Sequence, residues 1–237
     1  MKIQIIYRVV VVMCILVLVM STGCTNDQQQ DDNQPIVTSG NDTYATVLDA
    51  GTLDVRLDKY PVGVLSPAEV SDFQYMQEEE RLARDVYGVF YEKWEMQVFK
   101  NIGDAEQTHM DSVTVLIERY ELDVPSENGV PGVFSHAELQ ALYRDLTEAG
   151  MQSPEDALRA AALVEETDIA DLQGAISRTD KEDIRYVYQN LMRGSENHLR
   201  AFVKNLEGRG ESYAPAVLTQ GEYSEIIFTS VRLGGFS

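Results

Sequence analysis

The apolar positions of this chain recur at the spacing of an α-helix over most of its length. Instead of the strict alternation of a half-buried strand, apolar residues return at every third or fourth position. This pattern predicts four long helices, with one short helix between the second and the third. The long helices are expected over residues 66–95, 98–121, 153–177 and 180–208, and the short helix over residues 135–150.

Capping residues indicate where several of these helices begin. Ser66 precedes Pro67 and stands three residues before Glu69, which is the arrangement of a capping box with proline in the first turn. Ser153 and Asp180 are expected to cap the third and fourth long helices. The helix lengths predict an all-α fold, an antiparallel four-helix bundle with the short extra helix in the crossover between helices two and three.

Ionisable residues stand on the apolar stripes of all four long helices. Glu80 is the only charge on the stripe of the first helix, and Glu106 and His109 share the stripe of the second. Glu165 and His198 hold matching places in the third and the fourth. Because burial of unpaired ionisable groups costs several kcal/mol, this agreement in position predicts a metal site inside the bundle. Carboxylate oxygen and imidazole nitrogen are ligands that suit iron or manganese.

Some of these residues also have simpler interpretations. An inward Glu80 could pair with Arg84 or accept a hydrogen bond from Tyr87, and His198 could be a hydrogen-bonded core histidine. Tyr87 is a candidate hydrogen-bond partner of a metal ligand, although aromatic packing in the core is its simpler role. His136 is expected near the surface, in the first turn of the short helix. The agreement of four helices favours the metal site over these separate explanations.

The N-terminus has the composition of an export signal. Lys2 and Arg8 precede an apolar run that is short for a membrane span, and small residues follow it. Cys24 comes directly after them, which resembles the lipobox of exported lipoproteins, with Ser21 where leucine is usual. We therefore expect a signal peptide over residues 1–23 and an extracytoplasmic protein anchored to the membrane by lipidated Cys24. Simple secretion and an uncleaved signal anchor are the alternatives.

Composition also divides the rest of the chain. Residues 24–64 begin as a polar tether and are expected to end in an extended segment that lies against the bundle. The helical domain should cover residues 65–210. The tail over residues 211–237 contains Tyr223 together with Ile226 or Ile227, which could dock on the bundle as a short helix.

Charge and residue counts exclude several function classes. The chain has a net charge of −20, and removing Lys2 and Arg8 with the signal leaves 17 basic residues against 39 acidic ones. With no basic patch, we expect no nucleic-acid partner. Three histidines, and cysteines only at positions 14 and 24, leave the mature chain without a Cys/His or Ser/His/Asp set and without a disulfide. Hydrolase chemistry therefore ranks low.

Short motifs in the long helices follow one another in the order of a known family. The run ERLARDVY from Glu80 looks like an E-x-x-A-R-x-x-Y motif, and Glu106-x-x-His109 follows in the second helix. Glu165-x-x-Asp168 looks like a pair of carboxylates in the third. As a set, these motifs resemble the ferritin-like superfamily and, within it, the rubrerythrin-type di-iron proteins. They also look like an exported branch of this superfamily whose function is unassigned.

The fourth helix departs from the pattern that this resemblance implies. A Glu-x-x-His motif is expected, but Ser195 holds the carboxylate position before His198. Glu196 lies two residues before His198 and so about 200° around the helix. Asp168, which is on one of two stripes that can be drawn through the third helix, could compensate. Alternatively, a water fills the gap or the site holds a single metal.

The resemblance implies a centre of two iron ions, or of manganese, with oxidase, ferroxidase or peroxidase-type activity. Oxygen or peroxide would be the small oxidant. The electron donor would be external, because the chain has no cysteine-rich segment for a rubredoxin-like iron centre. The alternative function is a non-catalytic surface binding or structural bundle with a degenerate or single-metal site. The protein could also form a homo-oligomer. The implied metal ligands are Glu80, Glu106, His109, Glu165, Asp168 and His198.

Overall fold

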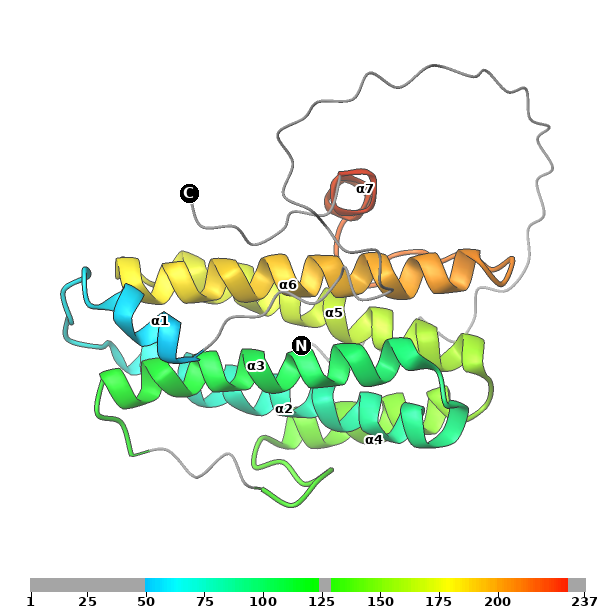
Figure 1. Ribbon diagram of the computed structural model, residues 1–237, viewed down its shortest axis with the longest axis horizontal. Helices are drawn as coiled ribbons and strands as arrows, with labels where there is room; N and C mark the ends of the chain where they lie inside the picture. The colour runs from blue at the N-terminus through cyan, green and yellow to red at the C-terminus, as the bar shows by residue number, and fades with distance from the viewer. Residues whose placement is uncertain (1–49, 124–128, 230–237) are drawn as a thin grey trace. The chain divides into compact units, whose positions relative to one another are not determined.

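The computed structural model of the chain describes residues 50–123 and 129–229, and these residues form helices without any strand. The predicted all-α class is therefore confirmed for the described part (Figure 1). The signal peptide, Cys24 and the polar tether lie outside the described residues. The helices are α1 (Ala50–Leu57), α2 (Pro67–Trp94), α3 (Gln97–Arg119), α4 (Ala137–Gly150), α5 (Pro154–Arg178), α6 (Glu182–Glu207) and α7 (Gln220–Phe228).

The start of α2 follows the predicted capping box, whereas the start of α6 does not follow its predicted cap. The hydroxyl of Ser66 accepts a hydrogen bond from the backbone N–H of Glu69, and the Glu69 carboxylate accepts one from Ser66 in return. Asp180 was expected to cap α6, but the N-cap is Lys181, with no side-chain cap. The Asp180 side chain is almost fully exposed and lies 3.5 Å from the Lys181 ammonium, so it does not reach the helix end.

Residues 50–57 correct a second expectation. They were expected to be extended, but they form α1, which packs against α3. Leu53 and Leu57 are one helical turn apart and both are fully buried. The Arg119 guanidinium of α3 donates to the backbone carbonyls of Leu57 and Tyr60, at 2.9 and 2.7 Å. Burial of the two leucines and these hydrogen bonds hold the helical turn in place.

The four long helices pack in a closed ring. α2 packs against α3, α3 against α6, α6 against α5 and α5 against α2. The colour gradient in Figure 1 shows that each helix runs opposite to its neighbours in the ring, and that α3 and α5 run in the same direction. The chain must therefore return along the ring between α3 and α5. α4 makes this return and packs against α2 and α5.

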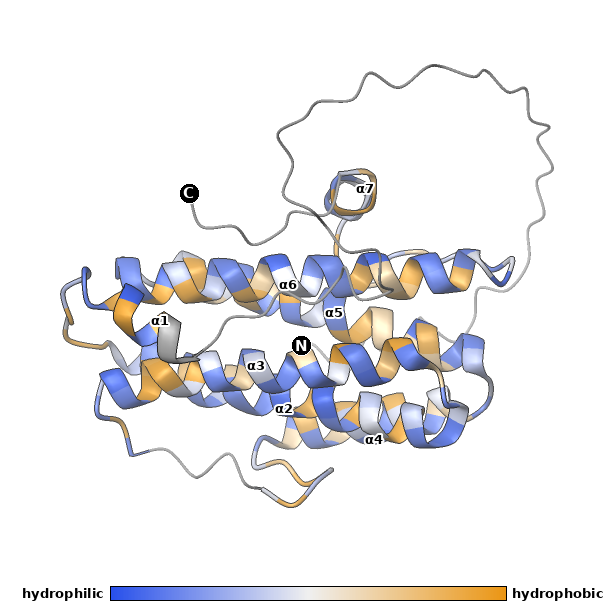
Figure 2. Ribbon diagram, viewed as in Figure 1, coloured by the Kyte–Doolittle hydropathy of each residue, from blue (hydrophilic) through white to orange (hydrophobic). Residues whose placement is uncertain are grey.

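Two clusters of buried apolar side chains lie along the ring, with polar residues between them. On α2, Phe73 and Met76 belong to one cluster, and Leu82 and Val86 belong to the other. The other three long helices divide in the same way, and Figure 2 shows hydrophobic and hydrophilic residues interleaved along each helix. The residues between the clusters are thus enclosed by apolar layers on both sides.

The C-terminal segment ends in α7, which packs against α6 and is seen end-on in Figure 1, so that it crosses the long helices. Tyr223 and Ile226 of α7 are buried. The Arg200 guanidinium of α6 donates to the Ile226 carbonyl at 2.6 Å. Within the described part of the chain, every helix is too short or too polar to cross a membrane.

Candidate metal centre

The polar layer between the two apolar clusters gathers the six predicted ligands. Each long helix contributes at least one of them, and each of the six keeps at most 5% of its surface exposed. They are Glu80 on α2, Glu106 and His109 on α3, Glu165 and Asp168 on α5, and His198 on α6. The helical stripes place them at one height because each stripe runs along the inner face of its helix.

Glu106 lies at the middle of this layer, between the two imidazoles. Its Oε2 is 2.9 Å from Nδ1 of His109, and its Oε1 is 2.8 Å from Nδ1 of His198. The imidazole rings are stacked, with centroids 5.2 Å apart and planes 24° apart. One ligand atom from each of these three residues fits within 4.8 Å of the other two. The arrangement could therefore hold a metal ion.

Two further carboxylates complete the environment of the imidazoles. Nδ1 of His109 is 3.3 Å from Oε2 of Glu80, and Nδ1 of His198 is 3.5 Å from Oε2 of Glu165. Each Nδ1 thus faces Glu106 and one other carboxylate. Glu80 and Glu165 come from α2 and α5, so the layer joins all four helices of the ring.

Ser195 does not leave a gap at the expected carboxylate position of α6. Its hydroxyl donates to Oδ2 of Asp168 at 2.5 Å, while Oδ1 of Asp168 has no hydrogen-bond partner within the described residues. Asp168 also interacts electrostatically with Glu80 and Glu165. Glu196 takes no part in the layer, because it is partly exposed and lies 3.6 Å from Arg200.

Several ligand atoms in the layer have no hydrogen-bond partner, although water does not reach them. In the described part of the chain these include Oε1 of Glu80, Oε1 of Glu106 and Nδ1 of His198. The last two are close to each other, yet their geometry is not that of a hydrogen bond. Buried polar atoms are normally satisfied. Atoms of this type that converge unsatisfied fit a cation bound by oxygen and nitrogen ligands.

Burial dominates the protonation of the carboxyls. It raises the pKa of Glu80 and of Glu165 to about 7, and that of Asp168 well above its usual range. For Glu106, burial acts in the same direction, but His198 and His109 outweigh it and hold the pKa below its ordinary value. Without a cation, several of these groups hold protons at neutral pH. A metal ion would displace those protons on binding.

The imidazoles respond in the opposite sense to burial. Burial alone would lower the pKa of both histidines. Glu80 and Glu106 outweigh it for His109, whose pKa is raised well above the usual range. Glu106 and Glu165 outweigh it for His198, whose pKa rises to about 9. The metal-free layer is therefore held together by attraction between imidazolium and carboxylate groups.

Tyr87 and Gly194 shape the layer without offering a ligand. The Tyr87 hydroxyl donates a short hydrogen bond to Oε1 of Glu165. The Tyr87 ring packs against the ring of Phe202, with the two ring centroids 5.2 Å apart. A Cβ atom at position 194 would lie 2.6 Å from Cε1 of His109 and closer still to Nε2. Glycine is therefore required there for the imidazole to approach α6.

The simpler interpretations hold for Tyr87, whose ring packs against Phe202 in the core, and for His136, but not for Glu80. Glu80 does not pair with Arg84, whose guanidinium binds Asp85 and Gln107. Tyr87 donates to Glu165 and not to Glu80. His136 is the N-cap of α4, is partly exposed as expected, and has its Nδ1 2.7 Å from Glu78.

The apolar stripes did not predict the burial of two acids next to the predicted ligands. Glu79 is 2% exposed, although it lies beside the apolar stripe of α2 and not on it. Glu166 is fully buried and accepts hydrogen bonds from the Tyr213 hydroxyl and from the backbone of residues 216–218. The only signal in the sequence was their position directly beside Glu80 and Glu165.

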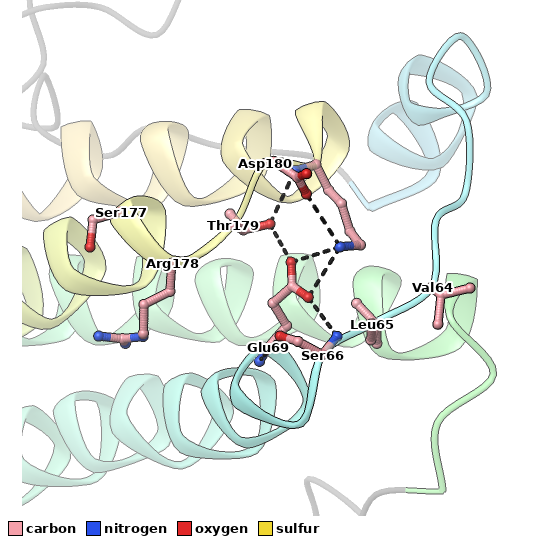
Figure 3. A pocket seen from close by; sticks show the side chains of 9 residues that line it. Val64, Leu65, Ser66, Glu69, Ser177, Arg178, Thr179 and Asp180 are labelled. Carbon is pink, nitrogen blue, oxygen red and sulfur yellow. Dashed lines mark hydrogen bonds and ion pairs between the residues drawn. The ribbon is translucent and has the colours of Figure 1, made fainter.

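A separate open pocket lies where α5 ends and α6 begins. Figure 3 shows Glu69 in this pocket, next to Thr179. The Thr179 hydroxyl donates a hydrogen bond to Glu69, and the Lys181 ammonium lies 2.9 Å from the same carboxylate. The charges of Glu69 and Lys181 thus neutralise each other, and their contact ties the start of α2 to the start of α6. We assign this pocket a structural role.

The fold and the polar layer together define an all-helical protein with a buried Glu/His group that could bind a metal. The chain belongs to the family described as "Uncharacterized protein domain (DUF2202)", whose model matches residues 69–230. That range contains all six residues of the layer.

The chain is also similar to an individual protein and to a solved structure. The chain is 47% identical over 178 residues to "Uncharacterized protein MJ0754" of Methanocaldococcus jannaschii, covering 75% of this chain and 96% of the relative. It is also similar to the crystal structure of hypothetical protein MJ0754 from Methanococcus jannaschii DSM 2661. That match has a TM-score of 0.71 and 48% identity, and it covers 73% of this chain and 98% of the other.

Proposed function

We propose that the ring of long helices is a ferritin-like four-helix bundle that holds two iron or manganese ions. The observation that carries this proposal is the position of Glu106, whose two oxygens face the Nδ1 atoms of two different histidines. Each Nδ1 also faces a second carboxylate. A central carboxylate with an imidazole and a second carboxylate on each side suits two metal ions better than a single metal ion.

The residues fit such a pair as two overlapping sets. Glu80, Glu106 and His109 would hold one ion, and Glu106, Glu165 and His198 would hold the other. Asp168 has one unsatisfied oxygen and Glu80 as its strongest electrostatic partner, so we assign it to the first ion. When bound, two redox-active ions this close would together supply the electron transfer needed to oxidise Fe(II) or to reduce oxygen or peroxide.

The surrounding residues would orient the ligands and keep water out. Tyr87 fixes Glu165 through its hydroxyl, and Ser195 fixes Asp168. The two apolar clusters close the layer from both sides, which admits a small oxidant more readily than a large substrate. Electrons would come from an external donor, because the only cysteines of the chain are at positions 14 and 24.

We also propose that the protein is exported and held at the membrane by lipidated Cys24, with secretion as the alternative. Support comes from the sequence alone, through the basic, apolar and small-residue order of the first 24 positions. Mass spectrometry of the protein purified from membranes tests it. Acylated Cys24 at a new N-terminus is the expected result, and a chain that still begins at Met1 contradicts it.

The redox proposal is tested by two assays on metal-loaded protein. Oxidation of Fe(II) under air and consumption of hydrogen peroxide with an artificial reductant should both exceed the rates of the free metal. If the protein binds metal but does neither, the catalytic proposal fails while metal binding stands.

A second candidate is a non-catalytic binding or structural bundle, in which the polar layer is a structural network or a degenerate site. The hydrogen bond from Ser195 to Asp168 favours this second candidate. Ser195 stands where a complete two-metal site would have a carboxylate, and its hydroxyl binds another residue of the layer. A structural network should keep its thermal stability when chelator is added, whereas a metal site should lose stability.

A further inference from the structure

Glu79 of α2 is a buried acid that the proposed metal centre does not use. Its side chain is 2% exposed, and no donor group among the described residues hydrogen-bonds either carboxylate oxygen. Other buried acids outside the centre are satisfied. Glu166 accepts from three backbone N–H groups, Glu69 pairs with Lys181, and Asp183 pairs with Arg119.

The neighbours of Glu79 are themselves acidic. Its strongest electrostatic interactions are with Asp168, Asp171 and Glu80, and the carboxyl of Asp171 lies close enough to share a proton with it. Asp168 and Asp171 are one turn apart on α5, which packs against α2. Two carboxyls held together in this way need a proton or a cation between them.

These acids form a series whose outer member is partly exposed and whose two inner members are buried. Asp171 is partly exposed, Glu79 is buried, and Asp168 is buried beside the ligands of the centre. The unsatisfied Oδ1 of Asp168 is the inner end of this series. Tyr75 lies at the outer end, where its hydroxyl is hydrogen-bonded to Asp171. The series thus leads from solvent to the centre along the contact between α2 and α5.

We propose that Asp171 and Glu79 form a transit site that passes divalent cations from solvent to Asp168 and the buried metal centre. This inference rests on the proposed function, since a route needs a destination. A line of carboxylates raises the local concentration of cations and speeds their capture. No basic side chain pairs with Glu79 among the described residues, and both of its oxygens are unsatisfied, so a passing cation can bind them in place of the proton between Glu79 and Asp171.

Metal-uptake kinetics test the route. Chelator-treated full-length protein is mixed with Co²⁺, and the absorption of bound Co²⁺ is followed in a stopped-flow instrument, with final metal content from elemental analysis. Glu79→Gln removes the charge and keeps the shape, and Asp171→Asn does the same at the partly exposed position. Glu148→Gln, on an exposed face of α4, is the matched control. Thermal melts of the metal-free variants check that each one folds.

We expect Glu79→Gln to slow uptake at least about tenfold, Asp171→Asn to slow it less, and the control to match the wild type. The final metal content should be unchanged in all four proteins. Wild-type rates in folded Glu79→Gln and Asp171→Asn would overturn the route. So would the loss of one bound ion in Glu79→Gln, because Glu79 would then be a ligand. If the wild type binds no Co²⁺, the proposed function itself fails, and the route fails with it.

Discussion

Glu106 lies between two imidazoles, with one carboxylate oxygen toward each. Replacement by glutamine should therefore remove both ions together, and not one of them. It should also destabilise the metal-free protein by about 3–5 kcal/mol, because it breaks a buried charge pair. Elemental analysis and urea unfolding measure these effects. Glu118→Gln, at an exposed position of the same helix, should change neither. Retention of one ion per chain in Glu106→Gln would contradict the shared role.

Gly194 allows the imidazole of His109 to lie against α6. In Gly194→Ala the new methyl group should displace the ring, lower metal affinity and cost about 1–3 kcal/mol of stability through overpacking. Gly88→Ala is the control, since a Cβ there would meet nothing within 4 Å. That substitution should stabilise α2 by about 0.5–1 kcal/mol. Calorimetry measures the stability of both variants, and Co²⁺ titration measures their metal affinity. Equal stability and equal Co²⁺ affinity in the two variants would contradict the role of Gly194.

The raised pKa values make the stability of the metal-free protein depend on pH. Burial raises the pKa of Glu80 and Glu165 from 4.5 to about 7. Glu106 and Glu165 overcome burial to raise the pKa of His198 from 6.5 to about 9. The folded state thus holds protons that the unfolded state has released, so this stabilisation is complete below the unfolded pKa values and is lost as pH rises through the folded ones.

Urea unfolding of the chelated protein should therefore show a midpoint that falls between about pH 5 and pH 9. Added metal should oppose this trend, because its binding displaces the same protons and becomes tighter as pH rises. A midpoint that rises over this range without metal would contradict the assigned pKa shifts.

The inward direction of the layer residues could be predicted because each lies on the apolar stripe of its helix. Glu79 and Glu166 lie about 100° from Glu80 and Glu165 on the same helices, so the stripes assign them to the flank. Both are nevertheless buried. α2 is covered by α3, α4 and α5 together, and Glu166 is covered by the C-terminal segment. An apolar stripe identifies one buried face of a helix. It does not show which other faces of that helix will be covered by additional helices or by a loop segment.

Among the elements, the segment that precedes α7 is attached to α5 through the buried side chain of Glu166. Glu166 accepts hydrogen bonds from the Tyr213 hydroxyl and from the backbone N–H groups of Ala216, Val217 and Leu218. In Glu166→Gln the charge-assisted acceptor is lost, which should cost about 1.5–3 kcal/mol. Hydrogen exchange should quicken first in α7. Glu225→Gln, exposed on α7, is the control. Unchanged exchange in α7 would contradict this attachment.

Helix boundaries were predictable where the cap is local and failed where a tertiary contact competes. Ser66 and Ser153 cap α2 and α5 through bonds to residues three positions on. Ser135 does not begin α4, because its hydroxyl and N–H both donate to Glu78 of α2. α1 was missed because eight residues give too short a periodic pattern, and its two leucines are decisive only once α3 is beside them.

For the whole molecule, a bound metal would join all four helices of the ring at mid-height. The antiparallel arrangement with a crossover was predicted from the helix lengths. The positions of the two imidazoles, next to opposite oxygens of Glu106, could not be predicted, because they depend on how each helix is rotated about its axis. Metal that binds only the folded state should add about 4 kcal/mol of stability when free metal is about 1,000 times Kd. Chelation should lower the melting temperature accordingly, and an unchanged melting temperature would favour a structural network.

The most direct test of the two-metal centre is the metal content of the purified protein after anaerobic loading with Fe(II) or Mn(II) and removal of free metal. Elemental analysis should give close to two ions per chain for the wild type, and His198→Ala should lose at least one of them. No bound metal in the wild type, or the same content in His198→Ala, would contradict the account.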